Sequence, residues 1–180
     1  MAEQEEEPKI VWFPYLKNMM RFNVDDDSMA AVPYAKAELY FHVSTKFAQV
    51  CAMAGGVLGT GIGCFKKNSY PLKGLISGTR NGMIAGIPLG ILATYGAMKL
   101  IQSRDYDQDM DYAYYDRAYR IRYNRNQIRV DSTALACLAA GMFVPVPGFT
   151  PLHVAAMGFV GGSIAAGSYN RTLKFIRSFN

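Results

Sequence analysis

The stretch Gly74–Gly90 reads GLISGTRNGMIAGIPLG, with glycine at every fourth position: Gly74, Gly78, Gly82, Gly86 and Gly90. On a helix, residues four apart lie on one face, so these glycines form a nearly continuous groove without side chains. Each glycine inside a helix costs about 1 kcal/mol relative to alanine. In a bilayer this cost is offset, because a bare backbone stripe lets a second helix approach closely. The stretch therefore predicts a membrane helix that packs tightly against a neighbour.

The same spacing recurs in other apolar segments. The positions are Gly55, Gly59 and Gly63 in one segment, Gly158, Gly162 and Ala166 in another, and Ala136 with Ala140 in a weaker run. Together these segments predict an all-α membrane protein with four short transmembrane helices packed through glycine and other small residues. The alternative is a soluble, glycine-rich protein with buried helices.

Composition supports one membrane domain between charged ends. About half of the 180 residues are hydrophobic, yet the mean hydropathy is only +0.02. The charges collect in the first 46 residues, in residues 104–131 and after residue 170. The net charge of +5 suits anionic lipid or acidic protein partners. No recognisable nucleic-acid-binding motif accompanies it, so nucleic acid is not expected as a partner.

Three parts follow from this distribution: an N-terminal tail with interfacial helices (residues 1–46), a transmembrane domain (47–170) with a polar loop (102–130), and a basic tail (171–180). The expected membrane segments are Phe47–Phe65, Leu72–Ile101, Ser132–Val146 and Leu152–Tyr169. The third segment covers only about 22 Å of a hydrocarbon core about 30 Å thick. It therefore needs help from neighbouring helices, from local thinning, or from helix that extends into Arg129 and Val130.

The first 46 residues contain an amphipathic segment, Ile10–Phe22, in which Trp12 suits the headgroup depth of a membrane. Packing of this segment on the protein's own core, or binding to a partner, is the alternative. Asp25, Asp26, Asp27 and Ser28 offer the start of a further helix that runs from Met29 through Lys46.

The polar loop 102–130 is acidic in its first half and basic in its second half. Its arginines, including Arg117, Arg120 and Arg122, predict a docking surface for partner subunits; the alternative is a solvated charged face. The basic end of the chain, Arg171, Lys174 and Arg177, suits phospholipid headgroups such as those of cardiolipin.

The sequence shows no catalytic constellation. Its two histidines, His42 and His153, have no cysteine or carboxylate at ligand spacing, so no metal site is expected. No cofactor, small-molecule substrate or enzymatic activity is expected either. Arg80 and Asn81 lie inside the glycine ladder, and a cation there requires protein, water or headgroup contacts. Both are expected to be buried polar residues in a cavity or ion pair; snorkelling of Arg80 to the interface is the alternative.

The four glycine-rich helices, the run Gly78-Thr79-Arg80-Asn81-Gly82, and the acidic start without a presequence resemble the mitochondrial inner-membrane translocase (Tim) family. The similarity covers residues 47–170. It implies a multi-pass protein of the mitochondrial inner membrane whose termini face the intermembrane space. A simple count of positive charges would instead place the termini in the matrix.

The Tim family includes protein-import channel subunits and an accessory subunit of respiratory complex I. The loop 102–130 is longer than in the import channels, and no import-subunit cysteine pairing is present. These departures favour a structural accessory subunit of the complex I membrane arm, supporting assembly without catalysis. The alternative is a subunit of a protein-import translocase, in which Arg80 and Asn81 would line a polar cavity.

Overall fold

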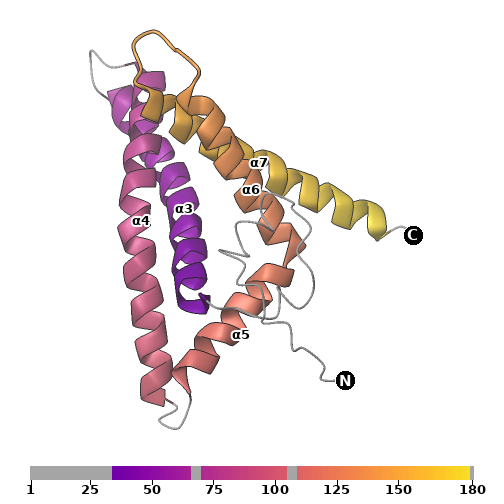
Figure 1. Cartoon of the computed structure of the whole chain (residues 1–180). Coiled ribbons are helices and arrows are strands. Elements are labelled where there is room, and N and C mark those ends of the chain that lie inside the picture. Colours follow the sequence, from indigo (N-terminus) through magenta and orange to yellow (C-terminus); the bar gives the residue numbers. More distant parts are fainter. Residues whose placement is uncertain (1–33, 66–69, 105–108, 179–180) are drawn as a thin grey trace, which may run out of the picture.

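The computed structural model describes residues 34–65, 70–104 and 109–178, and every regular element in these ranges is a helix (Figure 1). The five helices are α3 (Ala35–Phe65), α4 (Pro71–Arg104), α5 (Met110–Tyr123), α6 (Arg125–Met142) and α7 (Pro151–Arg177). The predicted all-α class is confirmed for this part of the chain. Trp12 and the amphipathic segment around it lie outside the described residues.

The long helices α3 and α4 form an antiparallel pair (Figure 1). The backbone of Gly63, near the end of α3, lies against that of Pro71 at the start of α4. Farther along the pair, Ser44 of α3 lies against Gly90 of α4. Pro71 occupies the first turn of its helix, where a missing N–H removes no helical hydrogen bond.

The shorter helices α6 and α7 form a second antiparallel pair, joined by residues 143–150. Gly148 in this connection has a φ of 82°, a left-handed conformation that favours glycine. Pro151 then opens α7, and the Thr150 N–H donates to Nδ1 of His153 at 3.3 Å. The connection therefore ends in a capped helix start that fixes where α7 begins.

Helix α5 joins the two pairs, running from the end of α4 to the start of α6 (Figure 1). Asp109 caps its start by accepting a hydrogen bond from the Asp111 N–H at 2.9 Å. Asn124 ends α5 and starts α6: its N–H donates to the Ile121 carbonyl, and its side chain accepts from the Gln127 N–H. One residue therefore separates the two helices.

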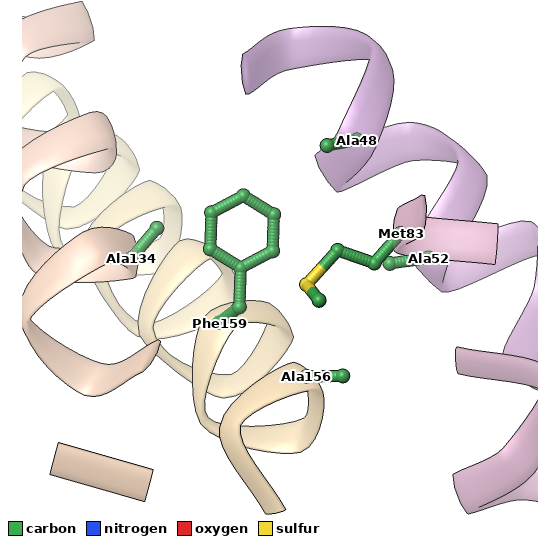
Figure 2. Packing of buried hydrophobic residues seen from close by; sticks show 6 residues of the cluster. All are labelled: Ala48, Ala52, Met83, Ala134, Ala156 and Phe159. Carbon is green, nitrogen blue, oxygen red and sulfur yellow. The ribbon is translucent and has the colours of Figure 1, made fainter. Parts of the chain in front are cut away.

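The two pairs meet around a small apolar core that Figure 2 shows from close by. It combines alanines with two larger side chains and contains Ala48, Ala52, Met83, Ala134, Ala156 and Phe159. Phe159 of α7 is 2% exposed and points between the pairs toward Met83 of α4. A second cluster, Leu39, Met98 and Ala113, fastens α5 to the first pair. Side chains thus fill the region between the pairs.

Several expected boundaries differ from the structure. One continuous helix, α3, replaces the separate helices expected on either side of residue 46. The expected polar loop 102–130 contains all of α5 and the first turns of α6, and α7 continues through the expected tail to Arg177. The sequence interpretation ended membrane segments where charges begin. In the structure the same helices continue through the charged residues, and on α3, α5 and α6 some of these residues find partners inside the protein.

Among the described helices two, α3 and α4, are long and apolar enough to cross a membrane, rather than the four expected. Helix α6 is not apolar enough to cross a membrane, because its first half carries the charged side chains Arg125, Arg129 and Asp131. In the apolar 18-residue stretch of α3, only 28% is buried inside the protein, and in that of α4 only 22% is buried.

Candidate functional site

The eight glycines predicted to pack in the first two membrane helices all lie where α3 meets α4. A Cβ atom added to any of them would collide with, or press on, the backbone of the other helix; the positions are Gly55, Gly59, Gly63, Gly74, Gly78, Gly82, Gly86 and Gly90. At Gly86 the added atom would lie 2.6 Å from the Ala48 Cα, and at Gly90 it would lie 2.5 Å from the Ser44 Cα. Side chains are thus excluded from this contact, and the two backbones touch.

The α6–α7 pair is built in the same way. Gly158 lies against the carbonyl of Cys137, and Gly162 lies against that of Thr133. Gly141, which the spacing argument did not single out, lies against Ala155 at the loop end of the pair. Gly61, Gly96, Gly161 and Gly167 face open space instead.

Arg80 and Asn81 were predicted to be buried polar residues, and for Asn81 this prediction is wrong. Asn81 is exposed and Arg80 is half-buried. The Arg80 guanidinium donates from Nε and Nη2 to the Asn81 Oδ1, at 3.0 and 2.7 Å. Adjacent residues point about 100° apart on a helix, so a glycine on one face does not bury its neighbour in sequence.

The basic residues predicted to contact partners or lipid fall into two groups. Arg120, Arg171, Lys174 and Arg177 are exposed, and Arg117 is half-buried with its Nη1 donating to the Ala113 carbonyl at 2.9 Å. Arg122 differs, because it is only 1% exposed. The prediction that Arg122 meets an outside partner is therefore wrong.

The partner of Arg122 is Glu38, on the first turn of α3. Arg122 donates from Nε to Glu38 Oε2 at 2.8 Å and from Nη2 to Oε1 at 2.5 Å. Glu38 is 2% exposed, so both charges are removed from solvent. This two-point geometry matches the planar guanidinium to the carboxylate, and it fixes α5 against α3.

A second buried polar cluster joins α3 to α6 around Asp131. One oxygen of this carboxylate lies 2.9 Å from His42 Nδ1, and the other lies 2.5 Å from Lys46 Nζ. The side-chain amide of Gln49 also donates to the carboxylate, at 3.2 Å. Asp131 is fully buried, so these donors replace the water that it loses.

Asp131 lies ahead of the apolar part of α6, and opposing effects act on its pKa. Burial favours the neutral acid and raises the pKa, but hydrogen bonds from His42 and Lys46, together with their charges, outweigh burial. The net result is a pKa of Asp131 below its ordinary value. The cluster therefore holds an ionised carboxylate between two helices.

The sequence carried a signal for these clusters. Glu38, His42 and Lys46 are four residues apart, and Gln49 follows three residues later, so all four lie on one face of α3. The sequence interpretation placed the first three outside the membrane domain and Gln49 inside it, and it paired none of them with residues 84 and 85 positions away. Among the described residues, no three His, Cys, Asp or Glu side chains gather in a way that could hold a metal ion.

The helix directions bring most of the charged segments to one end of the protein. The start of α3, the end of α4, all of α5 and the start of α6 lie toward this end, while the end of α7 extends away from α3 and α4 (Figure 1). The opposite end carries the 143–150 connection. The two ion-pair clusters lie toward the charged end and hold α3 against α5 and α6.

Comparison with known proteins gives a family without an assigned activity. No curated protein matches the chain. Residues 15–170 match a family described as "Protein of unknown function (DUF1757)". This match covers the five described helices except the end of α7, and the chain belongs to that family.

Proposed function

We propose that the protein is a structural, non-catalytic subunit of a mitochondrial inner-membrane complex, the membrane arm of respiratory complex I. In this proposal the α3–α4 and α6–α7 pairs form one four-helix membrane domain, and α5 with the charged end contacts other subunits. The expectation of complex I comes from the resemblance to the Tim family and from the long insertion. The proposed membrane location rests on the exposed surface of α3 and α4.

The outer faces of α3 and α4 are apolar and uncovered. Large side chains there include Val57, Leu58, Ile62, Ile84, Ile87 and Leu92, with Val57 71% and Leu92 64% exposed. In a soluble protein, apolar helices of this length are the core and are mostly buried. Lipid or other apolar subunits would cover these faces, which supports a protein that works inside a membrane assembly.

The interior favours a brace over a channel subunit. Met83 and Phe159 fill the space between the pairs, and both helix pairs are held by backbone contacts at glycine. The Asp131 and Glu38 clusters then tie α3 to α6 and α5. Such a rigid body suits the support of neighbouring subunits, whereas the translocase alternative requires a polar path for a polypeptide.

Depletion of the protein from cells separates the two roles. We expect complex I assembly and NADH-linked respiration to fall while import of a presequence-bearing reporter stays normal. Re-expression of the protein should restore respiration, and the Gly86→Leu variant, which blocks the α3–α4 contact, should not. Failed import with normal complex I assembly would replace this proposal with the translocase role.

A further inference from the structure

The junction of α5 and α6, together with the end of α7, lines a shallow, open groove of about 590 Å³. Its lining includes Tyr119, Arg120, Tyr123, Arg125 and Arg177. The three arginines come from three different helices, α5, α6 and α7. The volume falls within the range of small-ligand sites, about 300–1,000 Å³.

The groove has a strongly positive lining. Among the described residues that line it, none is acidic. Arg120 Nε lies 3.1 Å from the Asp116 carboxylate one turn earlier, in a pair whose arginine is largely solvent-exposed. Within the described part of the chain, Arg125 and Arg177 form no ion pair. At least two guanidinium groups are therefore available to an anion.

The charge of the groove comes from its arginines. Arg125 is the first residue of the 18-residue helix α6, and Asn124 both ends α5 and caps α6. The partial positive charge at the start of α6 therefore lies beside the partial negative charge at the end of α5.

The groove is held in shape by contacts between α6 and α7. The Asn170 side chain donates to the Asn126 carbonyl at 3.0 Å, and Arg129 donates to the Asn170 side chain. The Arg129 guanidinium also lies over the Tyr169 ring, 5.1 Å from its centroid. These contacts fix α7 at Tyr169 and Asn170 beside the start of α6, about two turns before Arg177.

We propose that this groove binds the phosphate of an anionic phospholipid headgroup. Arginine guanidinium groups match phosphate oxygens in shape and charge. Phe175 and Ile176 precede Arg177 on α7 and are 64% and 52% exposed, although neither lines the groove. The choice of a lipid over a free phosphate ester rests on the proposed membrane location, since both carry the same phosphate chemistry.

Native mass spectrometry of the full-length protein in neutral detergent tests this site, with phosphatidylglycerol and phosphatidylcholine as added lipids. The groove variant carries Arg120→Gln, Arg125→Gln and Arg177→Gln. The matched control carries Lys73→Gln, Lys99→Gln and Arg104→Gln, three exposed charges on α4. We expect the groove variant to lose phosphatidylglycerol binding on the order of 100-fold, at about fivefold per arginine, and the control to bind nearly as well as the natural sequence.

Three outcomes would overturn the assignment. Equal loss in both variants would mean attraction to overall charge. Binding of phosphatidylcholine as strong as that of phosphatidylglycerol would mean that the net negative charge of the headgroup is not recognised. Displacement of the lipid by an equal concentration of glycerol phosphate would show a site for soluble phosphate esters. Arg177→Gln alone, on the last exposed residue of α7, supplies the same test if the triple variant unfolds. None of these results depends on complex I, because binding is measured on the isolated protein.

Discussion

Arg122 of α5 and Glu38 of α3 lie 84 positions apart in the chain and form a two-point ion pair that is almost completely buried. Removing one partner leaves an uncompensated charge inside the protein, which costs about 3–5 kcal/mol. We therefore expect Arg122→Met to lower the thermal midpoint of the detergent-purified protein strongly. Arg120→Met, on the exposed surface of the same helix, should change it little.

The double variant Glu38→Leu/Arg122→Met gives the complementary test of this pair. Replacing a buried ion pair by apolar side chains of similar size is often neutral or stabilising. We expect the double variant to recover most of the stability that Arg122→Met loses. A mild effect of Arg122→Met by itself would mean that Arg122 faces solvent or a partner subunit, as the sequence interpretation held.

Two glycines of α4 should respond to alanine with opposite signs. At Gly86, the new Cβ would lie 2.6 Å from the Ala48 Cα, so Gly86→Ala must force the helices apart. At Gly96 nothing lies within 4 Å, and alanine should stabilise the helix by about 1 kcal/mol. Thermal unfolding of both variants measures the difference. Similar shifts in one direction would contradict the backbone contact between α3 and α4.

Acid should weaken the contact between α3 and α6. The pKa of Asp131 is lowered in the folded protein from its ordinary value of 3.8, so ionisation of this carboxylate stabilises the fold above that value. This stabilising contribution is lost as the pH falls through the lowered pKa of Asp131, because the protonated carboxyl no longer acts as a counter-ion for Lys46 and His42. A series of unfolding midpoints from neutral pH down to below 3.8 should show this loss.

Asp131→Asn provides the control for the acid series. This variant should be less stable at neutral pH, because Lys46 keeps its charge without a buried carboxylate. It should also show a shallower decline in acid, since the titrating group is gone. An acid decline as steep as that of the natural sequence would assign the effect to other carboxylates.

The glycine contacts were predictable from the sequence, and the ion pairs were not. The run expected on α6, Ala136 with Ala140, is exposed instead. Glycine spacing is a local property of each helix, and Gly55, Gly78 and Gly86 all lie at the α3–α4 contact. The pairing of Glu38 with Arg122 depends on how α5 folds back across α3, which no local spacing encodes. The row Glu38, His42 and Lys46 was visible as one face of a helix, but its partners were not.

Helix ends were misplaced for a related physical reason. The sequence interpretation treated Lys46 and the charges before Ser132 as limits of membrane segments. In the structure, Lys46 and Asp131 neutralise each other, so α3 and α6 pass through them without interruption. A charge inside a helix marks a boundary only when no partner on another helix compensates it.

Extraction at alkaline pH tests membrane integration by itself. The apolar outer faces of α3 and α4 should keep the protein in the membrane pellet after carbonate washing. A protein held only by exposed charges would leave the membrane under these conditions. Variants of the exposed arginines Arg120 and Arg125 should stay in the pellet as well, because neither contributes to burial in hydrocarbon.

The most direct measurement of the proposed role is native-gel fractionation of digitonin-solubilised mitochondrial membranes, followed by mass spectrometry of each fraction. We expect the protein to migrate with NADH dehydrogenase activity and with the subunits of the complex I membrane arm. Migration with protein-import subunits, or recovery in the soluble fraction, would contradict it.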